Sequence, residues 1–351
     1  MSDFDWRDLV PVLQTEDLAA LCARAYAHKC TRLGKRVALR GLVEISNVCQ
    51  KNCFYCGIRR ENAGVTRYRM TEDEIVAACE WSAEAGYGSV VLQAGEVQGE
   101  AETRLVERVL ARLHERYGDE LGITLSLGEQ SEETFRRWKA AGAHRYLLRI
   151  ETSNRELYAK LHPADHSWQE RLECLHALRR LGYIVGTGVM VGLPGQTVED
   201  LARDIAFFRD EDVDMIGMGP FIEDPATPLF DRSVDPAARK ASERAKFNLT
   251  LRMIAAARLC LDDVNLAAAT ALQAIDPEGR EKGVLAGANV IMPNVTPAKY
   301  RADYQLYPNK PCVADHAEAC RGCLERRLRA IGEEIAWGTR GDPLHFGRGR
   351  A

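Results

Sequence analysis

The sequence has no hydrophobic run long enough to cross a membrane. Its apolar stretches are shorter than the roughly 18 consecutive apolar residues that a transmembrane helix requires. An excess of positive charge is also missing: 47 Lys and Arg against 51 Asp and Glu give a net charge of −4, which argues against a protein that coats nucleic acid. The opening stretch, MSDFDWRDLV, is broken by charged side chains, so we expect no secretory signal and a cytoplasmic location.

Ser/Gly-rich linkers and low-complexity tracts are absent, so we expect one domain with additions at its ends. A chain of 351 residues can bury about three quarters of its unfolded surface, and its core therefore needs no covalent cross-links. It nevertheless contains 11 Cys. In a reducing cytoplasm, clustered thiols more often bind metal or react than form disulfides. We therefore expect some of these Cys to have a chemical function.

Short apolar runs rich in β-branched residues alternate with helix-length segments. Such runs are typical of parallel strands that are buried on both faces. The segments between them begin at capping signals, as at Thr71–Glu74 and Ser167–Glu170. The expected strands are Leu42–Ser46, Ser89–Ala94, Ile123–Ser126, Arg145–Ile150, Val185–Val191, Met215–Phe221, Asn265–Ala269 and Asn289–Pro293.

Eight strand–helix units predict an α/β fold, a closed (β/α)8 TIM barrel, with an open doubly wound sheet as the alternative. A barrel takes about 250 residues. We therefore expect an N-terminal helical segment over residues 1–38, the barrel over 39–300 and a C-terminal extension over 301–351. Active sites of such barrels follow the C-terminal ends of the strands. Unusual residues follow the expected strands here, at 47–56, Gly95-Glu96, Gly128-Glu129, Glu151-Thr152 and Gly192–Gly195.

A first cysteine group, Cys49, Cys53 and Cys56, directly follows the first expected strand with the spacing C-x3-C-x2-C. A loop this tight can place three thiolates around one metal centre. Structural zinc sites and most iron–sulfur clusters are closed by four protein ligands, and no fourth ligand is nearby. The pattern therefore indicates a centre with one position left open for an exogenous ligand. The alternative is a zinc site completed by His28 or another remote residue.

A second group, Cys312, Cys320 and Cys323, lies beyond the last expected strand, in the extension. Its C-x7-C-x2-C spacing indicates a second iron–sulfur cluster, either [2Fe–2S] or [4Fe–4S]. A zinc site completed by His316 is the alternative. The other five Cys lack paired spacing, and we expect them to be core residues: Cys22, Cys30, Cys79, Cys174 and Cys260.

The first group, with Tyr55 before its last Cys, resembles the motif of the radical S-adenosylmethionine (SAM) superfamily. The resemblance implies that Cys49, Cys53 and Cys56 hold a [4Fe–4S] cluster, and that SAM chelates its fourth iron. Gly95-Glu96 and Val191–Thr197 resemble the elements that meet the amino group and the adenine of SAM. The residues that the resemblance places against SAM are Tyr55, Glu96, Glu151, Arg171, Met190 and Met215.

Later stretches are similar to one branch of the superfamily, the HydE maturases of [FeFe]-hydrogenase in the biotin-synthase-like group. They include Met190–Thr197, Gly217–Ile222, Gly287–Asn294 and Tyr304–Pro308. The similarity implies an enzyme that helps to build the di-iron, dithiolate-bridged centre of the hydrogenase. Its substrate would be an iron–cysteine complex with carbon monoxide and cyanide ligands. Its partners would be a tyrosine-cleaving radical SAM maturase, a scaffold GTPase and a one-electron reductant.

The same similarity places the substrate inside the barrel, against Ala94, Ser126, Arg149, Thr270 and Tyr304. Three positions depart from the HydE pattern: Ala94 replaces a Ser, Ile150 a His and Ala269 a Thr. Each departure removes a hydrogen-bonding group from the expected pocket, so these positions bear on which substrate is accepted.

The resemblance also implies a reaction, in which one electron from the reduced cluster cleaves SAM to methionine and a 5′-deoxyadenosyl radical that attacks the substrate in the barrel. Two alternatives remain open. One is another biotin-synthase-like enzyme, a mutase or a sulfur-chemistry enzyme, acting on a small amino-acid-like substrate. The other is a non-enzymatic zinc-binding interaction protein.

Overall fold

In a computed structural model, residues 4–313 and 317–347 are described, with only the backbone described at 318–320. The strands of this part of the chain form one sheet in which every pair is parallel, in the order β10-β1-β9-β8-β7-β6-β5-β4-β3-β2. The strands are β1 Arg36–Leu39, β2 Gly41–Ser46, β3 Ser89–Ala94, β4 Gly122–Ser126, β5 Arg145–Leu147, β6 Ile184–Val191, β7 Met215–Pro220, β8 Asn265–Ala268, β9 Val290–Ile291 and β10 Glu334–Ile335.

The sheet closes into a ring through β1 and β2, which are consecutive parts of one extended segment interrupted at Arg40. β1 pairs with β9 on one side, whereas β2 pairs with β3 on the other. The backbone N–H of Arg40 donates to the carbonyl of Ile291 at 3.0 Å, and Leu42 pairs with Asn294. The last strand of the ring is thereby bonded to the first, and the predicted (β/α)8 barrel is confirmed.

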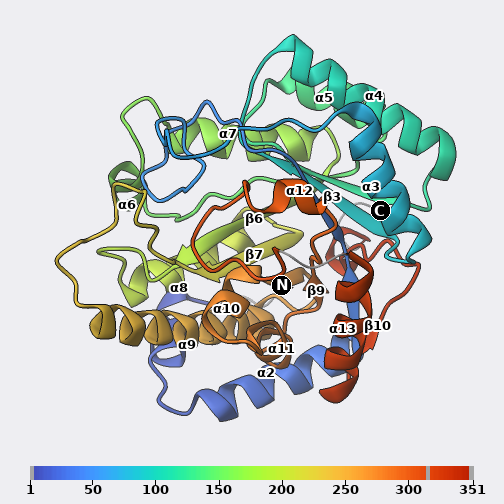
Figure 1. Ribbon diagram of the computed structural model, residues 1–351. Helices are drawn as coiled ribbons and strands as arrows, with labels where there is room; N and C mark the ends of the chain where they lie inside the picture. The colour runs from blue at the N-terminus through green and yellow to red at the C-terminus, as the bar shows by residue number, and fades with distance from the viewer. Residues whose placement is uncertain (1–3, 314–316, 348–351) are drawn as a thin grey trace.

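Helices cover the outside of the ring, so both faces of every barrel strand are buried (Figure 1). Parallel strands need such crossover helices, since a tight turn cannot connect them. Thr71 caps α3 with the expected capping box, and Ser167 caps α7. The covering helices are α3 Glu72–Glu84, α4 Glu100–Tyr117, α5 Glu132–Ala140, α6 Arg155–Leu161, α7 Trp168–Arg180, α8 Val198–Asp210, α9 Pro236–Cys260, α10 Thr270–Ile275 and α11 Gly279–Leu285.

The strand bounds agree with the sequence prediction to within a few residues, and the largest difference is in β5. This strand ends at Leu147 rather than at Ile150. The N–H of Ile150 donates to the side-chain Oγ1 of Thr187 at 3.0 Å, in place of a backbone carbonyl. Glu151 then takes a left-handed backbone conformation with φ of 66°. The side chain of Thr187 therefore interrupts the backbone hydrogen bonds between β5 and β6. The pattern of apolar residues does not predict such a local effect.

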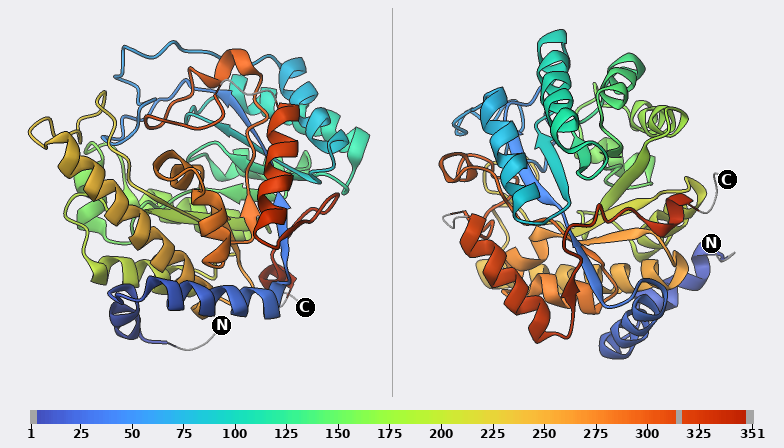
Figure 2. Two further views of the ribbon diagram at one scale, coloured as in Figure 1. Left: turned by 60° about the horizontal axis from the view of Figure 1, so that its bottom comes forward. Right: turned by 90° about the vertical axis from the view of Figure 1, so that its right-hand side faces the viewer.

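Before the barrel come α1 (Trp6–Leu13) and α2 (Leu18–Leu33), which pack against α8 and α9 (Figure 2). The expected boundary between residues 38 and 39 falls inside β1, so we propose that the barrel begins at Arg36. No helix in residues 4–313 and 317–347 is long and apolar enough to cross a membrane.

The extension contributes α12 (Ala298–Arg301), α13 (Ala317–Ala330), β10 and a 3-10 helix, η1 (Leu344–Gly347). Residues 340–342 cover the N-terminal end of the ring. The carbonyl of Gly341 accepts from Arg40 at 3.2 Å and from Asn265 at 2.8 Å, while Arg145 pairs with Asp342. The barrel is thus closed at this end.

Candidate active site

A cavity of about 350 Å³ lies inside the barrel, toward the C-terminal ends of the strands. All three Cys of the first group line it, together with residues from each of the eight barrel positions and from the extension. A cavity of this size is typical of small-molecule sites. The side chains of the predicted site that line it are Cys49, Tyr55, Cys53, Cys56, Ala94, Glu96, Ser126, Arg149, Glu151, Arg171, Met190, Thr270 and Tyr304.

The loop that carries the three Cys is held by hydrogen bonds from several elements. Arg67 donates from Nη1 to the carbonyls of Asn47 and Ile58 at 2.7 and 2.8 Å, and from Nη2 to the carbonyl of Arg59 at 2.6 Å. The N–H of Phe54 donates to the carbonyl of Leu161 at 2.9 Å. Because the loop has no helix or strand of its own, these contacts set the positions of the thiols.

The thiols themselves are poorly solvated. Burial raises the pKa of Cys53 to about 12, and it also raises the pKa of Cys49 and of Cys56. All three thiols are therefore neutral in the protein alone. Metal ligation requires thiolates, and a cationic centre between the three groups would offset the burial that now disfavours them. The donor set, three soft sulfur ligands facing one cavity, fits an iron–sulfur cluster.

No three His, Cys, Asp or Glu side chains, within the ranges that the structure describes, converge closely enough to ligate a single ion.

Two carboxylates and two cations meet at the rim beside the Cys loop. Lys51 Nζ donates to Glu129 at 2.7 Å and lies 3.4 Å from Glu96, while Arg171 Nε donates to the other oxygen of Glu129 at 2.7 Å. Burial, and next the charge of Glu129, raises the pKa of Glu96 to about 7. Burial acts to raise the pKa of Glu129 too, but Arg171 and Lys51 outweigh it and lower that pKa. The network therefore presents both signs of charge, as a zwitterionic amino-acid group requires.

Arg149 and Glu151 stand side by side at the end of β5. Their side chains form an ion pair, with 3.1 Å between Nη2 and Oε2. Arg149 also donates to the carbonyl of Val189 at 2.8 Å. The buried Oε2 of Glu151 accepts no aligned hydrogen bond. Glu151 lines the cavity, so this carboxylate, which pairs with Arg149 without an aligned hydrogen bond, can accept one from a ligand donor.

Tyr55 is oriented by a neutral histidine that the sequence did not reveal. His162 Nδ1 lies 2.8 Å from the carbonyl of Tyr158, which can only accept, so this nitrogen carries the proton. Nε2 of His162 then accepts from the hydroxyl of Tyr55 at 3.2 Å. Burial lowers the pKa of His162 to about 3, which keeps the imidazole neutral. The ring of Tyr55 is therefore fixed at the cavity wall.

The side of the cavity next to the end of the Cys loop is built by the extension, where the N–H of Gly57 donates to the carbonyl of Leu306 at 3.0 Å. Tyr304 is buried, and its hydroxyl accepts from Gln93 at 3.1 Å. Lys310 donates to Glu44 at 2.5 Å and to the carbonyl of Tyr304 at 2.9 Å. Figure 1 shows the segment after α12 lying across the middle of the ring. Residues 304–310 therefore complete a cavity that the strands leave open.

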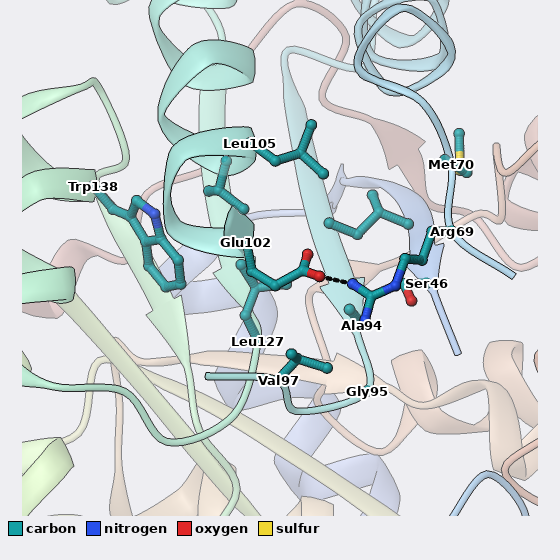
Figure 3. A pocket seen from close by; sticks show the side chains of 12 residues that line it. Ser46, Arg69, Met70, Ala94, Gly95, Val97, Glu102, Leu105, Leu127 and Trp138 are labelled. Carbon is teal, nitrogen blue, oxygen red and sulfur yellow. Dashed lines mark ion pairs between the residues drawn. The ribbon is translucent and has the colours of Figure 1, made fainter. Parts of the chain in front are cut away.

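A second hollow, of about 30 Å³, lies outside the ring between the ends of β2 and β3 and the helices α4 and α5 (Figure 3). It is mostly apolar, and Arg69 and Glu102 form an ion pair across it. Ala94 and Gly95 border both this hollow and the central cavity. The end of β3 is thus a thin partition, and Ala94 contributes only a methyl group to it.

The structure does not bring every predicted site residue to the central cavity. Met215 lies below it, among the residues of a smaller hollow at the barrel floor, with its sulfur 2.9 Å from Nη1 of Arg40. Conversely, Lys51, Glu44 and Lys310 line the cavity although no role was predicted for them, and Glu129, which was noted only for its place after a strand, pairs with Lys51 beside the cavity. Glu129 was detectable as an acidic residue after a strand; the role of Lys310 depends on a contact far along the chain.

Of the second Cys group, Cys312 and Cys323 do not line the central cavity. Cys312 has a left-handed φ of 61°, and its carbonyl accepts from Arg301 at 3.1 Å. Cys323 is exposed on α13. The side chain of Cys320, and all of His316, lie outside the described residues. The expected second cluster therefore stays a prediction.

Comparison with known proteins agrees with this geometry. The family model described as the Radical SAM superfamily matches residues 43–208, the span from β2 to α8. The [FeFe] hydrogenase maturase subunit HydE of Thermotoga maritima is 44% identical over 313 residues, which cover 88% of this chain and 85% of the maturase. The 3-methylornithine synthase of Methanosarcina acetivorans is 28% identical, over 83% of this chain and 79% of the synthase.

Among solved structures, methylornithine synthase (PylB) superposes with a TM-score of 0.78 at 24% identity, covering 96% of this chain and 95% of that one. The maturase HydG from Carboxydothermus hydrogenoformans gives a TM-score of 0.77 at 18% identity, covering 96% of this chain and 76% of that one. These two likenesses show the fold. The sequence identity to the Thermotoga protein over most of both chains shows the family: this protein belongs to the radical SAM superfamily and, within it, to the HydE family.

Proposed function

We propose that this protein is a radical SAM enzyme that takes part in maturation of the [FeFe]-hydrogenase active site. The observation that carries the proposal is that three half-buried thiols line one cavity and that a charge network of four residues lies beside them. A [4Fe–4S] cluster held by Cys49, Cys53 and Cys56, with SAM bound to it, would supply reductive cleavage of SAM to a 5′-deoxyadenosyl radical.

The chain's own residues would bind and orient the reactants. Glu96 and Lys51 offer opposite charges beside the Cys loop, where the amino and carboxylate groups of SAM would bind. Arg171 holds Glu129 in place, and Glu151 offers a buried acceptor on the same side. Tyr55 and Met190 supply apolar contact surface for the rest of the cofactor. Met215 lies below the cavity, so it would support the cavity floor and would not contact SAM.

The substrate would lie deeper in the barrel, between Ser126, Arg149, Thr270 and Tyr304, with Ala94 at the end of β3. We propose an iron–cysteine complex bearing carbon monoxide and cyanide as this substrate. The enclosed barrel, sealed at one end by residues 340–342, would keep water and oxygen from the reacting groups.

We further propose that Cys312, Cys320 and Cys323 hold a second iron–sulfur cluster, and that the protein works in the cytoplasm. Its partners would be a one-electron reductant, a tyrosine-cleaving radical SAM maturase and a scaffold GTPase. Metal and sulfide analysis of a Cys312→Ser variant, against the wild type, tests the second cluster: two clusters per chain should fall to one.

The enzymatic proposal is tested by anaerobic assay of 5′-deoxyadenosine. We expect the wild type, after reconstitution, to be brown with absorbance near about 400 nm, as iron–sulfur proteins are. The iron–cysteine complex should accelerate SAM cleavage more than a simple thiol does, and Cys53→Ser should abolish cleavage. A colourless, zinc-containing protein, or SAM cleavage retained by Cys53→Ser, would refute the proposal.

A further inference from the structure

One wall of the central cavity is built from the smallest side chains in the protein. β7 and β8 pair in parallel, with Gly217 beside Ala267. Gly219 and Ala269 follow two residues later on each segment and also line the cavity. None of these four side chains can donate or accept a hydrogen bond. The wall is therefore apolar, and it recedes from the axis of the barrel.

The rest of the cavity wall has the opposite character. It carries an ion pair, Glu44 with Lys310, and the guanidinium of Arg149. It also carries amide and hydroxyl groups, from Gln93, Ser126 and Tyr304. The cavity thus has a polar side, suited to charged groups, and a hollow apolar side. A ligand that fills both must itself have two dissimilar ends.

Gly217 is not explained by the needs of the fold. Its φ is not left-handed, so its backbone suits any residue. A Cβ built on it meets no atom within 4 Å, whereas a Cβ on its neighbour Gly188, in β6, would collide with the carbonyl of Gly217. Packing accounts for Gly188 but not for Gly217. A strand glycine destabilises the fold relative to Ala, so a glycine without a packing reason indicates that the space it leaves has another use.

We propose that Gly217 sets the size limit of the substrate. The space beside it receives a compact, bulky group that forms no strong hydrogen bonds, while the charged end of the substrate faces Arg149 and Lys310. The inference rests on the proposed function: in the iron–cysteine complex, the iron with its carbon monoxide ligands is such a group, and the cysteine is the charged end. Gly219 and Ala269 widen the same space toward the mouth of the cavity.

The test is to fill this space. Gly217→Val adds three carbons to the open space that Gly217 borders, between the central cavity and the hollow at the barrel floor. Gly347→Val is the matched control, because Gly347 is exposed in η1 and its Cβ also meets nothing within 4 Å. Overfilling a close-packed space costs 1–3 kcal/mol, which corresponds to about 5- to 150-fold in binding. We expect the Kd of the iron–cysteine complex to rise at least about 10-fold in Gly217→Val and to be unchanged in Gly347→Val.

Binding is measured on the reconstituted protein, as the complex retained after gel filtration and quantified by the infrared bands of its carbon monoxide and cyanide ligands. L-cysteine, which lacks the bulky end, should bind both variants equally well. SAM binding and the thermal unfolding midpoint report whether each variant is folded. Gly217→Ala, with about 5-fold weaker binding expected, replaces Gly217→Val if the latter does not fold.

The outcomes separate the two proposals. If the wild type does not retain the iron complex, the proposed function fails. If the wild type and Gly217→Val retain it equally, the size limit is refuted while the proposed function stands. Equal weakening of L-cysteine and of the iron complex would also refute the size limit, since it would indicate a general disturbance of the cavity.

Discussion

The buried ion pair between Lys310 and Glu44 ties the extension to the barrel, and its removal should cost much of the stability of the protein. The two residues are 266 positions apart in the chain. Their side chains are only 8% and 2% exposed, and 2.5 Å separates Nζ from Oε1. Replacing Lys310 with Met keeps the length and apolar character of the side chain but leaves the carboxylate of Glu44 without its cation.

The size of the loss follows from that burial. Removing one partner of a buried ion pair typically costs 3–5 kcal/mol, because the remaining charge stays uncompensated. The amide of Asn294 still donates to the other oxygen of Glu44, at 2.9 Å, which favours the lower end of the range. We therefore expect Lys310→Met to lower the free energy of unfolding by about 3 kcal/mol.

Lys299→Met provides a matched control within the same extension. Lys299 pairs with Glu74 at the same 2.5 Å, but its side chain is 63% exposed. Exposed pairs contribute about 0–1 kcal/mol, so this variant should unfold almost as the wild type does. Urea denaturation of the metal-free proteins, followed by far-ultraviolet circular dichroism, measures both. Equal losses in the two variants would refute the reasoning that burial, and not the distance, decides the value of the pair.

The pH dependence supplies a second check. Burial raises the pKa of Glu44, and Lys310 opposes that rise. Without Lys310, the folded-state pKa lies further above the unfolded value. A carboxyl with a raised folded-state pKa favours folding while it is protonated, and this contribution is lost as the pH rises through that pKa. The deficit of Lys310→Met should therefore shrink toward about pH 4 and grow toward neutral pH, and Glu44→Gln in the same chain should remove this dependence.

Two further predictions concern other buried groups. Burial raises the pKa of Asp204, which accepts hydrogen bonds from Ser153, to about 7, so its contribution to stability is present below its ordinary pKa and is lost as the pH rises through about 7. By urea denaturation, Asp204→Asn should become more stable relative to the wild type between pH 5 and 8, by up to about 3 kcal/mol; parallel pH curves would contradict this. In the Cys loop, a Cβ on Gly57 would collide with the carbonyl of Gln305, so Gly57→Ala should reduce the iron bound per chain after reconstitution. Gly64→Ala, whose nearest contact would be at 3.4 Å, should bind iron as the wild type does, and equal iron contents would refute the role of this contact.

Local pattern in the sequence determined much of the molecule. Runs such as 89–94 are mostly apolar because both faces of a parallel strand are buried, and the structure has this strand with the predicted bounds. The spacing of Cys49, Cys53 and Cys56 places three thiols within eight residues, so a short loop is bound to keep them near one another. Barrel topology then puts the residues after each strand at one end. The lining of the central cavity by these Cys, with Glu96, Glu151 and Arg149, follows from these rules.

Tertiary structure alone decided the rest, because it depends on contacts between distant parts of the chain. Closure of the ring at Arg40 brings β9 beside β1, and only then can Lys310 reach Glu44 and Tyr304 line the cavity. Met215 is sequence-adjacent to the cavity-lining part of β7 but lies one layer lower, since the register along a strand sets depth in the barrel. The sequence identified the chemistry through residue types at short spacing. The shape of the space in which that chemistry occurs required the closed barrel and the extension that covers it.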